Sequence, residues 1–152
     1  MLKTLTEFFR RDPDPAKNGT SIDAPLAAAA LMLEVTWADH ETDLTEIERS
    51  TALLEQLFNL DASAAGQLVD DARDRLQHNV GVQTYTRHLN EALCEADKFD
   101  VITALWRVAQ ASNGVDRFEE HTIRRIADLL YLSHERFIQA KLLARQNPSN
   151  PS

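Results

Sequence analysis

The sequence has little cysteine, glycine or proline, and no apolar run long enough to cross a membrane. Its 152 residues include 4 glycines, 5 prolines and 1 cysteine. The lone Cys94 cannot form an intramolecular disulfide, which is typical of a reducing compartment. The longest apolar run, Ala24 to Leu33, has ten residues, about half of a bilayer span. The start of the chain lacks the apolar core of a signal peptide, so we expect a cytoplasmic protein.

The excess of acidic over basic residues disfavours nucleic acid as a partner. The formal net charge is -8, from 24 acidic and 16 basic residues. Because a negative surface repels phosphate backbones, we expect no nucleic-acid partner. Cations and basic protein surfaces suit this charge better. We therefore expect a protein partner, and a homodimer is one arrangement that the sequence leaves open.

The composition favours helices throughout the chain. Alanine and leucine are abundant, strand-like alternation is nearly absent, and apolar residues recur at helical spacing. We predict an all-α, single-domain bundle of about seven to eight helices. Residues 1–11 are expected to form an amphipathic helix, 12–22 a linker, 23–146 the helical domain and 147–152 a disordered tail. The first helix has too few basic residues for firm anchoring, which disfavours peripheral membrane contact.

An internal repeat organises the predicted domain. Three positions recur at a constant offset of 73 residues: Ala38 with Ala111, Asp43 with Asp116, and Glu46 with Glu119. Each copy consists of an apolar helix, a short loop, a capping box and an amphipathic helix. Neither copy could bury its apolar helix alone. We therefore predict two pseudo-symmetric helix-loop-helix repeats that pack face to face about a two-fold axis.

Two charged residues occupy equivalent positions on the two most apolar predicted helices. These residues are Glu34 and Arg107. A lone buried charge costs several kcal/mol, whereas a hydrogen-bonded pair is tolerated. The sequence therefore predicts that Glu34 and Arg107 meet in or near the core, unless each long side chain reaches solvent by itself.

Four carboxylates lie within eight residues after the first apolar helix: Asp39, Glu41, Asp43 and Glu46. Hard cations such as Ca²⁺ and Mg²⁺ require several oxygen ligands, so these residues are metal-site candidates. Capping of the following helix explains Asp43 and Glu46 without any metal. It does not explain Asp39 and Glu41, because the C-terminal end of a helix disfavours negative charge.

An EF-hand and an enzyme are both disfavoured by the sequence. The glycine and bidentate-glutamate positions of an EF-hand loop would fall on Leu44 and Ser50. No nucleophile elbow, phosphate-binding glycine loop or zinc-protease signature is present. The histidines are scattered, and no motif would activate Cys94. We therefore expect no enzymatic activity.

Several segments resemble a known family. Residues 31–43 are similar to the first repeat of the TerB-like (tellurite resistance protein B) family, in which an Ala-Asp-Gly-Glu stretch ends a helix. Residues 104–111 and 118–130 resemble the second repeat, and 133–141 continue it. The resemblance implies a cytoplasmic, bacterial, all-helical bundle linked to tellurite and other stress responses. The N-terminal domain of the DjlA co-chaperone is related to the same group.

The family has no established enzymatic activity, and its acidic loops have been proposed to bind metal ions. The first loop of the family corresponds to Asp39, Glu41, Asp43 and Glu46. In the second loop only Asp116 and Glu119 match, because residues 112–114 depart from the family pattern, so a second site is less well supported. Two functions follow as expectations: a non-enzymatic interaction module whose acidic loop binds a cation, or a structural, scaffolding domain whose acidic loops are only helix caps.

Overall fold

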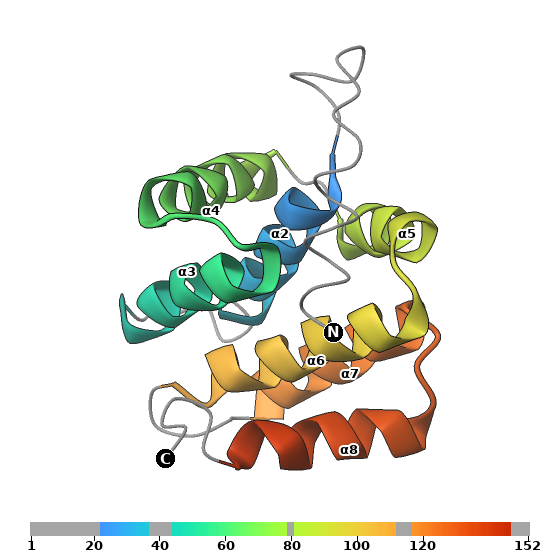
Figure 1. The fold of residues 1–152 in the computed structure, drawn as a ribbon. Coiled ribbons are helices and arrows are strands. Elements are labelled where there is room, and N and C mark those ends of the chain that lie inside the picture. The colour runs from blue at the N-terminus through green and yellow to red at the C-terminus, as the bar shows by residue number, and fades with distance from the viewer. Residues whose placement is uncertain (1–21, 37–43, 79–80, 112–116, 147–152) are drawn as a thin grey trace.

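A computed structural model describes residues 22–36, 44–78, 81–111 and 117–146. These residues form seven α-helices and no strand (Figure 1). The helices are α2 (Ala24–Thr36), α3 (Leu44–Phe58), α4 (Ala62–Gln77), α5 (Val82–Ala92), α6 (Glu95–Ala109), α7 (Arg117–Leu129) and α8 (His134–Arg145). The all-α prediction is confirmed. The predicted N-terminal helix (1–11), nearly all of the linker and the tail (147–152) lie outside the described residues.

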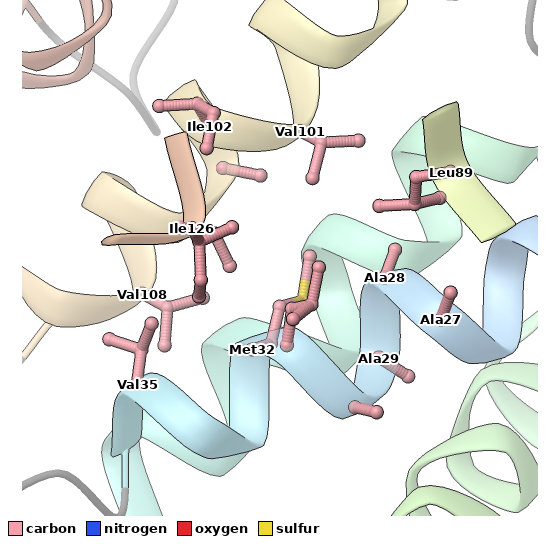
Figure 2. Close-up of a cluster of buried hydrophobic side chains, with 14 of the residues drawn as sticks. Ala27, Ala28, Ala29, Met32, Val35, Leu89, Val101, Ile102, Val108 and Ile126 are labelled. Atoms are coloured by element: carbon pink, nitrogen blue, oxygen red, sulfur yellow. The ribbon is translucent and has the colours of Figure 1, made fainter. Parts of the chain in front are cut away.

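Helix α2 is the central element of the core. Every residue of α2 except Glu34 is buried, as its apolar sequence predicts. It contacts each of α3, α4, α5, α6 and α7. The four alanines from Ala27 to Ala30 are at most 1% exposed, so the neighbouring helices close around small side chains. Figure 2 shows part of this core, in which Met32 and Val35 of α2 lie near residues of α6 and α7.

Polar side chains cap three of the helices, as the sequence predicts. The Asp23 carboxylate accepts a hydrogen bond from the Leu26 amide at 3.1 Å at the start of α2. Asp61 accepts from Ala64 at 2.7 Å, and the Ser133 hydroxyl accepts from Arg136 at 3.1 Å. These bonds satisfy amides that have no partner within the helix. Asp43 and Asp116, the other predicted caps, lie outside the described residues.

The start of α6 differs from the sequence prediction. The apolar stripe of this helix begins at Phe99, which predicts a start near Lys98, whereas α6 begins at Glu95. Cys94 has extended backbone angles and makes no side-chain capping bond. Glu95 and Asp97 lie in the first turn, where negative charge is favourable. The dipole of α6 and its packing against other helices thus allow the helix to begin before the first residue of its apolar stripe.

The connections that follow α3 and α7 have the same backbone geometry. The α3–α4 and α7–α8 connections both contain a left-handed residue, Asn59 (φ 56°) and Tyr131 (φ 64°), 72 positions apart. In each connection the next amide bonds to a carbonyl five residues earlier, at 3.0 Å: Leu60 to Glu55 and Leu132 to Ala127. This pattern is a Schellman motif. Helix α2 packs on α4 as α6 packs on α8, and α2 contacts α6. The two-fold axis itself stays a prediction.

Candidate functional site

Two of the predicted cation ligands lie on described helices, and both are buried. Glu46 and Glu119 are 2% and 3% exposed, in the first turns of α3 and α7. Both side chains have interaction partners. The N-terminal end of a helix favours negative charge, so each of these two carboxylates lies where the dipole of its own helix is favourable. The other candidates, Asp39, Glu41, Asp43 and Asp116, lie outside the described residues.

The described segments alone do not assemble a metal centre. Within residues 22–36, 44–78, 81–111 and 117–146, no group of three or more His, Cys, Asp or Glu side chains could hold a metal ion. The four described histidines lie on or at the ends of four different helices: His78 at the end of α4, His88 on α5, His121 on α7 and His134 on α8. Cys94 is exposed and unpaired. These segments also contain no helix of the length and hydropathy needed to cross a membrane.

Different charged residues act on the pKa of Glu34 and on the pKa of Arg107. Among the described residues, no ion pair joins the two side chains. Burial raises the pKa of Glu34, and the positive charge of Arg125 on α7 partly opposes this rise. Burial lowers the pKa of Arg107, as does Arg49 on α3, whereas Asp100 raises it. Glu34 is thus influenced by α7, and Arg107 by α3 and its own helix.

A buried carboxylate, Asp97, and a half-buried one, Asp100, in the first half of α6 were missed by the sequence analysis. Asp97 is 2% exposed, and its Oδ1 atom has no hydrogen-bond partner among the described residues. Burial raises the pKa of Asp100, and the negative charge of Asp97 adds to this effect, while Arg107 and Arg136 oppose it. The sequence signal was the three-residue spacing, which puts both carboxylates on one helix face.

The raised pKa of Glu34 predicts a pH-dependent effect on stability. A carboxyl group whose folded-state pKa lies above its unfolded value makes folding less favourable at pH values above both. Its proton is favoured in the folded state, so the contribution of Glu34 to stability becomes less favourable as pH rises from about 4.5. The Glu34→Gln variant cannot ionise. We expect it to be more stable than the wild type at pH 7 by up to about 1 kcal/mol, and by less at pH 4.5.

Urea unfolding followed by circular dichroism at both pH values measures this difference. Glu48→Gln, at an exposed position of α3, is the matched control and should leave the difference near zero. A Glu34→Gln variant that is less stable than the wild type at pH 7 would contradict the prediction. That result would mean that attraction between Glu34 and Arg125 outweighs the burial of the charge.

One comparison with known proteins found a match that covers most of the chain. A family model described as tellurite resistance protein TerB matches residues 25–142. The match begins at the second residue of α2 and ends within α8, so it spans all seven described helices. Neither the curated proteins nor the solved structures contain a significant match to the chain.

Proposed function

Since the chain belongs to the TerB family, we propose that this tellurite-resistance-related helical module acts without enzymatic activity and binds a divalent cation through its first acidic loop. We further propose that it works in the cytoplasm, by binding a protein partner in a tellurite or stress response. Its net charge of -8 favours a basic protein surface or a cation over nucleic acid.

The observation that carries the cation proposal is the presence of four carboxylates within eight residues, Asp39, Glu41, Asp43 and Glu46, of which capping does not explain Asp39 and Glu41. The Glu46 carboxylate is 2% exposed at the start of α3, directly after the segment that contains the other three. In the sequence, Asp39 and Glu41 follow the residues of α2, and the C-terminal end of a helix attracts cations rather than anions. A cation bound there would neutralise carboxylates for which capping gives no reason. Ca²⁺ and Mg²⁺ are the expected ions.

The proposal that the module is not an enzyme rests on how its reactive side chains are distributed. The described histidines and Cys94 lie on separate elements, and catalysis by nucleophile and base needs such groups within hydrogen-bond reach. A binding module has no such requirement. Its function depends on surfaces and loops held in place by a rigid core.

Calorimetric titration with Ca²⁺, Mg²⁺ and Zn²⁺ tests the cation site. We expect the wild type to bind Ca²⁺ or Mg²⁺, and Asp39→Ala to bind at least about tenfold more weakly because one carboxylate ligand is lost. Glu48→Ala, at an exposed position of α3, is the control and should bind like the wild type.

The same titration distinguishes the alternative function. If the wild type releases no heat at millimolar metal, the cation proposal fails and the acidic residues are helix caps of a structural, scaffolding domain. Equal binding by the wild type and Asp39→Ala would show that any bound cation lies elsewhere.

A further inference from the structure

Two carboxylates in the first half of α6, Asp97 and Asp100, lack a partner in the part of the chain that the structure describes. Asp97 is 2% exposed, and its Oδ1 atom accepts no hydrogen bond there. The Oδ2 atom of the half-buried Asp100 is also buried and also accepts none. Neither side chain forms an ion pair with a described basic residue. A buried carboxylate without a partner is strongly destabilising, so a positive group beside these two, the α6 carboxylates, would be favourable.

The dipole of α6 compensates these charges only in part. Asp97 lies in the first turn, where the N-terminal end of a helix favours negative charge. Asp100 lies in the second turn, and the effect of the dipole falls off within the first. Burial raises the pKa of Asp100, and the negative charge of Asp97 raises it further. Capping of the helix therefore does not explain both carboxylates.

The described basic side chains closest to the α6 carboxylates make other contacts. Lys98 Nζ lies 3.4 Å from the carbonyl oxygen of Leu130, to which it donates a hydrogen bond. The Arg136 guanidinium lies over the Phe99 ring, 4.0 Å from its centre. Arg107 is about two turns further along α6 and forms no ion pair with a described residue.

Only one segment outside the described residues contains lysine or arginine. These segments are residues 1–21, 37–43, 79–80, 112–116 and 147–152. The first contains Lys3, Arg10, Arg11 and Lys17, and the other four contain no lysine or arginine. A partner that belongs to the chain itself is consistent with the burial of Asp97, because such a partner is present in every molecule. Residues 1–21 are therefore the best source of the positive charge.

The start of α2, to which residues 1–21 are joined, lies near the start of α6. Figure 2 shows Leu89, in the last turn of α5, near Ala28 in the second turn of α2. Two residues separate α5 from α6, and α2 contacts both helices. Arg11 precedes Ile22 by 11 residues, which span up to about 35 Å when extended. The segment is therefore long enough to reach the α6 carboxylates.

We propose that Arg10 and Arg11 form ion pairs with Asp97 and Asp100, which holds residues 1–21 against the beginning of α6 in the same molecule. Arginine suits these carboxylates better than lysine, because a guanidinium donates two parallel hydrogen bonds to one carboxylate and is more weakly hydrated. The attachment to α2 keeps the segment at a high local concentration, so the contact needs no second molecule.

A spin label on Cys94 of the full chain tests this contact by NMR. Cys94 is the only cysteine, is exposed, and makes no side-chain capping bond, so the label should leave α6 intact. The label weakens amide signals of residues that lie close to it. We expect residues 1–21 of the wild type to lose most of their signal intensity. The loss should disappear in Asp97→Asn with Asp100→Asn, and in Arg10→Gln with Arg11→Gln.

The controls separate this contact from misfolding and from contacts between molecules. Glu95→Gln removes a negative charge at an exposed position of the same turn and should lose intensity like the wild type. Circular dichroism checks folding, and if the aspartate variant does not fold, the arginine variant decides. Spin-labelled protein without ¹⁵N, mixed with unlabelled ¹⁵N protein, should weaken no signal of residues 1–21.

Three results would overturn the proposal. The first is a wild type in which residues 1–21 keep their full intensity beside the label. The second is a loss of intensity that persists in either folded double variant, since the segment would then lie near α6 without these ion pairs. The third is a loss of intensity in the mixture equal to that within one molecule, since the segment would then bind to a second copy.

Discussion

Replacing Trp106 with alanine is expected to lower the free energy of unfolding by about 3–5 kcal/mol. Trp106 is fully buried on α6, and its ring centre lies 5.4 Å from that of Phe137 on α8. The substitution would remove this contact between two helices and leave a cavity. The indole Nε1 atom has no hydrogen-bond partner among the described residues, so the loss would be one of packing and of the contact with Lys141, whose Nζ lies 5.2 Å from the ring centre.

Chemical unfolding in urea, followed by far-ultraviolet circular dichroism, measures this loss. A domain of this size is stable by about 5–15 kcal/mol, so the variant should unfold at a much lower urea concentration. Phe118→Ala is the matched control, since this aromatic side chain is 62% exposed, and its effect should stay within about 0.5 kcal/mol. A loss below about 1 kcal/mol for Trp106→Ala would be inconsistent with the packing of α6 on α8 described above.

Enlarging an alanine in α2 should also destabilise the protein, by about 1–3 kcal/mol. Ala28 is 0% exposed, and Figure 2 shows it near Leu89 of the neighbouring helix α5. Leucine is almost as good a helix former as alanine, so Ala28→Leu changes packing and hardly affects helix propensity. The added carbons can be placed only if α2 and its neighbours move apart.

The matched control is Ala64→Leu, which adds the same atoms at an exposed position of α4. We expect the control to change the urea midpoint little and Ala28→Leu to lower it clearly. If both variants were equally stable, the core around Ala28 would contain unfilled volume. The conclusion that the neighbouring helices pack tightly around α2 would then be wrong.

The helices and their caps were predictable because they depend on neighbours in sequence. The Asp61 and Ser133 side chains accept bonds from amides three residues ahead, a distance that the sequence alone fixes. The apolar sequence of α2, broken only by Glu34 between Leu26 and Val35, likewise predicts a helix buried on nearly every side. The start of α6 was less predictable, because its first turn contains acidic residues and no apolar stripe marks it.

The candidate site was only partly predictable, because the positions of its residues follow from the sequence whereas their burial depends on tertiary packing. The sequence identified Glu46 and Glu119 as equivalent positions at helix starts, which needs only the offset between the repeats. It did not predict that both would be buried, because burial depends on elements packed from other parts of the chain. The sequence also missed the orphan carboxylate oxygen of Asp97, since unsatisfied burial arises only once the helices pack.

The sequence by itself determined an all-helical chain, the order and most of the limits of its helices, and its membership of a family. Local hydrogen bonds and the 3.6-residue period decide these features, and both act within a few residues. Only the tertiary structure decided that the positive charge of Arg125 opposes the rise in the pKa of Glu34, and that Asp97 is buried with an oxygen atom that has no hydrogen-bond partner among the described residues. Such features depend on the size and charge of side chains that meet across long sequence separations.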